Sequence, residues 1–315
     1  MTVSLAALVG ALVVGILIPA QLERLCVMGI DPSVLIASWV LSITGVVVAG
    51  AAGVVLLLVP GHGVPGRLLD AVSSCWSSVR HGMSPRVEEL SGLLGLLVLL
   101  FGAARFILIG VRLAARRARS HRERLAVLRP AARVESGSPA ILWLAHDRPL
   151  AFSLPGRPGF LVATDGLQRQ LTKYEAAAVL EHERAHIRRR HHLLVSLAEV
   201  SKSGLPFLPL FRAAPRAVRD LVELAADDSA ARRCGAAAVR SALIRMAGNG
   251  SPGISLALCR DALDLRLDRL AETPRRNKWT RRTASCGLVA ITPVLPIVAA
   301  IVFFAGVSVI SCWNH

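Results

Sequence analysis

The sequence predicts a mainly α-helical membrane protein with four transmembrane helices and one polar domain on the cytoplasmic side. Hydrophobic residues make up 53% of the 315 residues and charged residues only 18%. The apolar residues fall into four long runs, and a bilayer core takes roughly 20 such residues to cross. The positive charge gathers between the third run and the fourth.

The four runs are residues 3–20, 34–59, 91–111 and 284–311. Arg105 is the one charge in them, near the cytoplasmic end of the third run. Its side chain can reach the membrane surface from there, although ionisable residues in spans are also often functional. No Lys or Arg precedes the first run and no small-residue cleavage site follows it, so we expect an uncleaved span.

The whole net charge of +16 lies in residues 112–283, which hold 32 Lys or Arg and 16 Asp or Glu. Arg-rich flanks next to the third and fourth runs are cytoplasmic by the positive-inside rule. Both termini are then outside, with three spans in 1–111 and the fourth span and a short tail in 284–315. No nucleic-acid recognition motif accompanies the charge, so we expect contact with the lipid bilayer but no direct nucleic-acid binding.

The cysteines show no C-x-x-C spacing, which argues against a cysteine metal site. Cys234 and Cys259 lie in the cytoplasmic segment and should stay reduced. Cys75 and Cys312 both fall outside in this topology, where they could pair.

Turn signals and helix signals divide the polar segment into elements. We expect a linker at 130–139 and a small hairpin sheet of strands at 140–145, 150–154 and 159–164. Thr172 with Glu175 is a capping box that predicts a helix from 172 to about 200. Further helices are expected at 215–234, 236–247 and 254–271.

His182 and His186 lie four residues apart, on one face of that helix. With Glu183 they form the His-Glu-x-x-His arrangement of zinc metallopeptidases, in which the glutamate is the general base. A chance match in a chain of this composition has a probability of roughly one in a hundred. The alternative is a charged, solvated helix face, but the apolar residues 176–180 lead the helix into a buried environment, where unpartnered polar groups are costly.

A catalytic zinc site needs a third protein ligand, and Glu223 on the next long helix is the best candidate. Asp227 shares its face and could hold the other ring N–H of a ligating histidine. The alternative for both is a surface acidic cluster together with Asp220 and Asp228.

Three other histidines are weaker candidates. His191 and His192 are alternative ligands, but on one continuous helix they project away from the first pair. With the arginines at 188–190 they would form a basic cap. His146 stands alone at a strand end, where a histidine is more often structural.

Residues 171–187 resemble the catalytic helix of integral-membrane zinc peptidases, through Leu171-Thr172, Glu175, Ala178-Val179-Leu180, His182-Glu183 and His186-Ile187. Two families fit: the BlaR/MecR-type antirepressor peptidases, and the HtpX and CAAX-prenyl-endopeptidase type. Glu223 and Asp227 match the Glu-x-x-x-Asp element of both families, and residues 151–167 resemble their hairpin and lead-in. The resemblance covers roughly residues 140–272 and implies a cytoplasmic α+β zincin-like domain with one zinc ion per chain.

Arg266-Leu267 with Leu270 resembles a distal element of these families. By that resemblance Arg266 would stabilise the oxyanion. The alternative is a salt-bridged helix residue beside Asp261, Asp264 and Asp268.

Three spans, a cytoplasmic zinc domain and a fourth span resemble the BlaR/MecR layout in the bacterial plasma membrane. That layout implies a zinc endopeptidase that cleaves a BlaI/MecI-type transcriptional repressor, with the sheet edge near 159–164 aligning the substrate. Those sensors continue into a penicillin-binding domain, which does not follow here, so we do not expect direct β-lactam sensing. An HtpX-like quality-control peptidase and a non-catalytic membrane signalling scaffold remain as alternatives.

Overall fold

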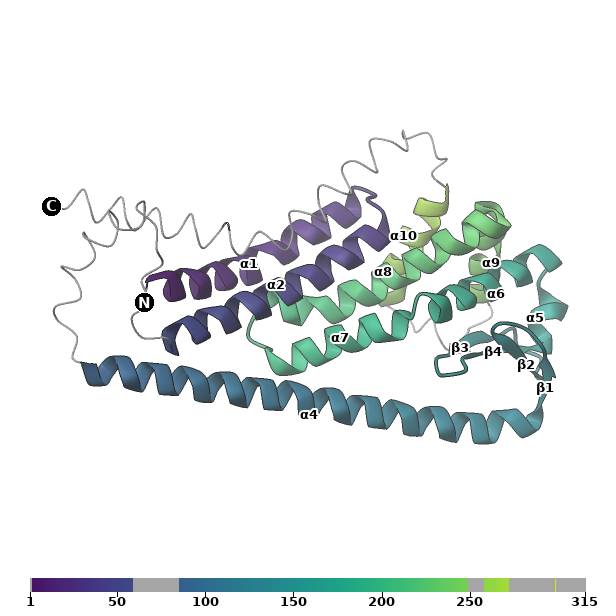
Figure 1. The fold of residues 1–315 in the computed structure, drawn as a ribbon. Coiled ribbons are helices and arrows are strands. Elements are labelled where there is room, and N and C mark those ends of the chain that lie inside the picture. The colour runs from purple at the N-terminus through teal and green to yellow at the C-terminus, as the bar shows by residue number, and fades with distance from the viewer. Residues whose placement is uncertain (1, 59–84, 249–257, 272–297, 299–315) are drawn as a thin grey trace.

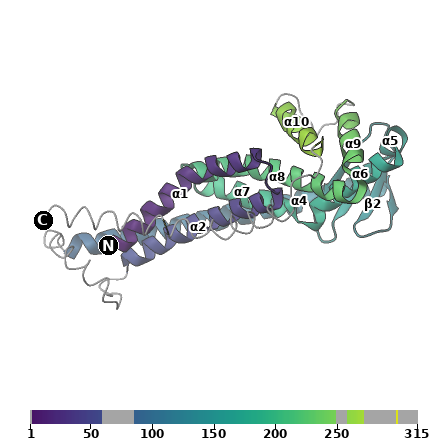
Figure 2. The same cartoon turned by 90° about the horizontal axis from the view of Figure 1, so that it is seen from above.

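The computed structural model describes residues 2–58, 85–248, 258–271 and 298. Helices α1 (Thr2–Val27), α2 (Pro32–Leu58), α7 (His191–Gly204) and α8 (Pro209–Cys234) form an elongated bundle. A small sheet lies at the far end of the molecule, and the long helix α4 (Pro85–Ala131) runs beside the bundle to reach it (Figures 1 and 2). The two ends of the molecule are therefore joined by the bundle and by α4.

Two helices of the described residues, at Ala6–Val27 and Pro32–Val55, are long and apolar enough to cross a membrane. Their inner faces pack on α8, with Trp39 and Phe211 almost fully buried. Their outer faces carry exposed apolar side chains, such as Leu17, which suits a surface that meets lipid. The third expected span falls inside α4, and the fourth, 284–311, lies outside the described residues, as do Cys75 and Cys312.

Helix α4 runs without interruption for 47 residues. It joins the third expected span and the Arg-rich flank that follows it into one rod. Along its length α4 packs against α2 and α7, and its last turns place Leu125 and Leu128 on the sheet.

The sheet has four strands in the order β1-β2-β4-β3. Its strands are β1 (Ala132–Glu135), β2 (Ala140–Leu144), β3 (Ala151–Leu154) and β4 (Phe160–Thr164). Strands β2 and β4 are parallel, and the β1–β2 and β3–β4 pairs are antiparallel. The three predicted strands are confirmed, but the expected linker at 130–139 is wrong because it contains β1. Trp143 Nε1 donates a hydrogen bond of 2.6 Å to Glu135 and ties this added strand to β2.

The expectation that residues 159–164 offer a free sheet edge is also wrong. Strand β4 lies between β2 and β3, so β3 forms the edge on that side. Alternate residues of the central strands face opposite layers. Ile141 and Leu161 pack toward α6 (Lys173–Arg188), and Leu142 and Val162 pack toward α4. Both faces of the sheet are thus covered by helices.

The capping box is confirmed: the Thr172 side chain accepts from the Glu175 N–H, and Glu175 accepts from the Thr172 N–H. The predicted helix to about Val200 is not continuous, however. Arg190 adopts a left-handed conformation (φ 52°, ψ 40°), which ends α6 and starts α7 in a new direction. No glycine or proline marks this break.

The remaining helices lie close to where the sequence predicts them. Helix α5 (Asp165–Gln170) links the sheet to α6, and α8 begins six residues earlier than expected, with Pro209 in its first turn, where a missing N–H is tolerated. Helix α9 (Ala236–Gly248) packs against α6 and α8, and α10 (Leu258–Ala271) packs against α9 and α8.

Candidate metal centre

Helices α6 and α8 approach closely because small residues line their contact. Ala178 and Ala185 on α6 and Ala226 and Ala230 on α8 are almost completely buried. Alanine leaves no long side chain to separate two helix backbones. The close approach brings the face of α6 that carries His182 and His186 next to the face of α8 that carries Glu223 and Asp227.

Two buried carboxylates hold α6 in place. Glu181 forms ion pairs with Arg188 of its own helix and, at 3.2 Å, with Arg233 of α8. Glu175, besides its capping role, accepts a hydrogen bond from Ser241 and pairs with Arg245 of α9 at 3.0 Å. These contacts hold the first turn and the second half of the helix, so His182 and His186 have a defined orientation.

His182, His186 and Glu223 come together as the sequence predicts, with ligand atoms that all lie within 4.8 Å of one another. The Nε2 atoms of the two histidines are 3.1 Å apart, and they lie 3.3 and 3.5 Å from the Glu223 carboxylate. Ligands at 2.0–2.1 Å from a tetrahedral zinc ion are separated by about 3.3 Å. The three donors therefore have the chemistry and the spacing of a zinc site.

Asp227 stands behind His182 and is 2% exposed. The His182 Nδ1–H donates to Asp227 Oδ1 at 2.9 Å, which leaves Nε2 as the ligand atom. Arg266 of α10 donates to both oxygens of the same carboxylate, at 2.6 and 2.8 Å. The surface acidic cluster is thus wrong for Asp227, which is a buried bridge between a ligand and a cation.

The charges of the site shift its pKa values strongly in the metal-free protein. Burial lowers the pKa of His182, but the hydrogen bonds to Asp227 and Glu223 outweigh burial and raise it to about 10. Burial opposes ionisation of Glu223 as well, yet His182, His186 and Arg266 hold its pKa well below the usual range. Burial lowers the pKa of His186 to about 4. A metal cation bound between His182, His186 and Glu223 would replace the proton that His182 otherwise retains.

His191 is the residue of the site that the sequence placed wrongly. The left-handed turn at Arg190 folds it back over α6, so it is 2% exposed and its Nδ1 lies 3.0 Å from Nδ1 of His186. For His186 to bind a metal through Nε2, its Nδ1 must carry the proton and donate it to His191. His191 is therefore a partner of a ligand rather than part of a solvated cap, and the side-chain contact depends on a turn that no sequence signal marks.

Glu183 lies beside the ligand cluster, since the charges of His182 and Glu223 act on it, and it accepts hydrogen bonds from Ser153 of the sheet. Burial raises the pKa of its carboxyl, and hydrogen bonds from the Ser153 hydroxyl and N–H partly offset this. In the β3–β4 register, Leu150 and Thr164 are hydrogen-bonded, so the N–H of Ser153 points away from β4. The outer edge of β3, which pairs with no other described strand, thus faces the expected general base.

The other expected residues lie in different surroundings. Among the described side chains, Arg266 forms ion pairs with Asp227 and, at 3.7 Å, with Glu223, so it is salt-bridged across to α8. His146 accepts a hydrogen bond from the Arg148 N–H and belongs to its own turn. His192 lines the cavity next to the site without contributing to the ligand cluster.

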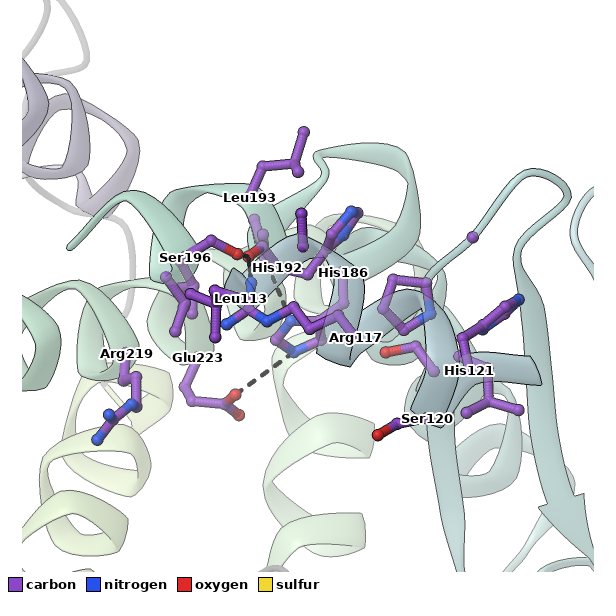
Figure 3. Close-up of a pocket in the computed structure, with 18 of the residues that line it drawn as sticks. Leu113, Arg117, Ser120, His121, His186, His192, Leu193, Ser196, Arg219 and Glu223 are labelled. Carbon is purple, nitrogen blue, oxygen red and sulfur yellow. Dashed lines mark hydrogen bonds and ion pairs between the residues drawn. The ribbon is translucent and has the colours of Figure 1, made fainter. Parts of the chain in front are cut away.

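A cavity of about 1550 Å³ opens beside the ligands, between α4, the β3–β4 turn, α7, α8 and α10. Figure 3 shows His186 and Glu223 at this cavity, with Arg117 and His121 of α4 and Arg219 of α8 around it. The Glu223 side chain is 42% exposed, so the ligand cluster is open toward the cavity. A substrate could reach the ligands from this side.

Residues 114–220 match the model of peptidase family M48, which covers about a third of the chain. The matched residues include His182, Glu183 and His186 and end three residues before Glu223. Comparison with curated proteins and with solved structures gave no match. Together with the geometry of the ligands, the family match supports a metallopeptidase of the membrane zincin type, a class that is generally zinc-dependent.

Proposed function

We propose that this protein is a membrane-bound zinc-dependent endopeptidase. The observation that carries the proposal is the spacing of His182, His186 and Glu223, which leaves a tetrahedral centre between two histidine nitrogens and one carboxylate. Three protein ligands leave one position open, as catalytic rather than structural zinc requires. The opening of this cluster onto a large cavity supports the same conclusion.

The chain's own residues have separate tasks in this reaction. A zinc ion held by the three ligands supplies Lewis-acid chemistry, because it lowers the pKa of water and polarises carbonyl oxygens. Glu183 accepts the proton of the attacking water and donates it to the leaving amine nitrogen. Its raised pKa suits a group that must both accept and return a proton near neutral pH. Asp227 keeps His182 in the tautomer that presents Nε2.

Arg266 and strand β3 are proposed to handle the substrate. The Arg266 guanidinium lies 3.7 Å from Glu223, near enough to stabilise negative charge on the substrate carbonyl oxygen. Apart from the Ser153 N–H, which donates to Glu183, the outer edge of β3 offers backbone groups that an extended peptide could pair with by strand addition. This edge replaces the one expected at 159–164, and it lies on the same side as Glu183.

As the substrate we propose a cytoplasmic transcriptional repressor of the BlaI/MecI type, whose cleavage would release target genes. The support is the resemblance of the span layout to the antirepressor peptidases. An HtpX-like peptidase for membrane-protein quality control uses the same catalytic residues, and the family match is equally compatible with it. A protein that folds the same way but acts as a scaffold is the remaining alternative.

The substitution Glu183→Gln tests the enzymatic function, because it removes the general base and leaves all three metal ligands in place. We expect the purified protein to retain about one zinc ion per chain, while its peptidase activity falls by roughly 10²–10⁴-fold. Glu123→Gln on the exposed surface of α4 is the matched control and should retain activity. If cells that carry the Glu183→Gln variant behave like wild-type cells, the result would instead support a non-catalytic scaffold function.

The same pair of strains identifies the substrate class. Proteins of the membrane and the cytosol are compared between cells with the wild-type protein and cells with Glu183→Gln. A single accumulating repressor supports the antirepressor proposal. Accumulation of many membrane proteins would contradict it and support quality control.

A further inference from the structure

The cavity beside the ligand cluster is strongly basic. Eight arginines line it, against two acidic residues, Asp220 and Glu223. One of these acids is a proposed zinc ligand, and the other lies 3.9 Å from Arg216. Arg219 and Arg266 are also paired, with Glu199 and Asp227 behind the cavity wall. The other five arginines form no ion pair with any described residue.

The arginines come from several separate elements. Arg116, Arg117, Arg122 and Arg124 lie on α4, Arg157 lies in the β3–β4 turn, and Arg216, Arg219 and Arg266 lie on α8 and α10. The positive-inside rule accounts for arginines on a helix that leaves a membrane. It does not account for Arg157, which lies in a turn of the sheet and lines the same cavity.

Part of this positive charge has no partner. Within the part of the chain that the structure describes, Arg124 and Arg157 form no ion pair, and both are exposed to solvent. His121 and His192 each hold a buried Nδ1 without a hydrogen-bond partner, also in the cavity wall (Figure 3). Uncompensated cations at a cavity are a feature of a site for an anionic ligand.

We propose that the cavity binds an acidic segment of the substrate chain, with Asp or Glu side chains within a few residues of the scissile bond. The proposal rests on the peptidase function proposed above and names the substrate class for that site. Small-molecule pockets have volumes of roughly 300–1,000 Å³, whereas this cavity has about 1550 Å³. That size suits a peptide segment, and the presence of His186 and Glu223 in its wall places the segment next to the reacting bond.

Anionic lipid headgroups would meet the same arginines if residues 91–111 cross the membrane. The cavity extends from Gly110, at the end of the third expected span, to Arg157 in the β3–β4 turn. Its end at Arg157 favours a peptide, because the sheet lies at the far end of the molecule from the first turns of α1 and α4 (Figure 1). Lipid binding is accordingly an outcome that the experiment must distinguish.

The first measurement is a cleavage profile of the full-length protein in detergent, with a proteome-derived peptide library and mass spectrometry. Cleavage by the Glu183→Gln variant is subtracted as background. We expect Asp and Glu to be enriched several-fold on one side of the cleaved bonds. Glu183-dependent cleavage without acidic enrichment would overturn the acidic-segment proposal and leave the peptidase intact. No Glu183-dependent cleavage at all would refute the peptidase, and this proposal with it.

The second measurement uses charge reversal at the unpaired cations, Arg124→Glu together with Arg157→Glu. We expect kcat/KM for an acidic peptide from the first profile to fall at least tenfold and that for its Asn/Gln counterpart to change less than twofold. Arg119→Glu, on the same helix but outside the cavity wall, is the matched control and should resemble wild type. Cleavage of the neutral peptide shows that the reversed protein is folded.

The salt dependence and the lipid dependence complete the test. Preference for the acidic peptide should weaken between about 50 and 500 mM salt, because ions screen exposed charges. If charge reversal instead lowers cleavage of both peptides equally and abolishes binding to phosphatidylglycerol vesicles, the cavity binds headgroups and the proposal is wrong.

Discussion

Substitution of Asp227 by asparagine is the sharpest test of the metal centre. Asp227 is not a ligand, yet its two oxygens receive the Nδ1–H of His182 and two N–H groups of Arg266. Asparagine keeps the shape and can still accept from His182. Its amide nitrogen, however, would face the guanidinium of Arg266, donor against donor, and the negative charge behind His182 would be lost.

The contacts give two separate magnitudes. Loss of the carboxylate partner of a ligating histidine costs about 10–100-fold in metal affinity, or roughly 1.4–2.8 kcal/mol. Breaking a buried ion pair costs roughly 3–5 kcal/mol of stability. The loss here should lie toward the lower end because Arg266 retains an ion pair with Glu223 at 3.7 Å.

Zinc affinity is measured by competition with a chromogenic chelator, and stability by thermal unfolding of the zinc-free protein. Asp228→Asn is the matched control, since the charge of Asp228 interacts chiefly with Arg269 and not with a ligand. Zinc affinity of Asp227→Asn within about twofold of wild type would refute the assignment of Asp227 as the partner of a ligand.

Three further predictions concern helix α6 and the residue that contacts it from α7. His191→Phe keeps an aromatic ring but removes the acceptor for His186, so zinc affinity in the same competition assay should fall roughly tenfold. His192→Phe is the control and should leave zinc affinity unchanged. Equal zinc affinities for the two variants would contradict the role of His191. The folded-state pKa of His182 in the zinc-free protein lies at about 10, above the ordinary 6.5. Protonated His182 therefore stabilises the fold fully below pH 6.5, and this stabilisation is lost as the pH rises toward 10. The melting temperature of the zinc-free protein should decline over that range, and a constant melting temperature would contradict the prediction. Thr172→Ala removes the capping box and should lower the free energy of unfolding by about 1 kcal/mol, measured by thermal unfolding, and no loss would show that the cap does not stabilise α6.

The local parts of the site could be predicted from the sequence. The spacing of His182 and His186 is a property of any helix, and the capping box at Thr172 marks where that helix begins. Glu223 and Asp227 could be predicted because a zinc site needs a third ligand and a partner for a histidine, and they stand on the next long helix.

What the sequence did not predict depends on contacts between distant segments. The helix breaks at Arg190, a residue type that rarely adopts a left-handed conformation. The break brings His191 into contact with His186, and this contact exists only in the folded chain. Strand β1 lies in a polar stretch, but it pairs along its length with β2, and Glu135 of β1 accepts a hydrogen bond from Trp143 of β2. Arg266 could be placed on a helix, but its pairing with Asp227 requires α10 to lie against α8.

The unbroken course of α4 has a mechanical consequence. Forty-seven helical residues extend about 70 Å, and a hydrocarbon core takes roughly 30 Å of that length. If residues 91–111 cross the membrane, the remainder is a stiff rod that ends on the sheet through Leu125 and Leu128. A tilt or shift of the membrane-embedded half would therefore be transmitted as a displacement of Arg117 and Arg124 in the cavity wall, without any change in the ligands themselves.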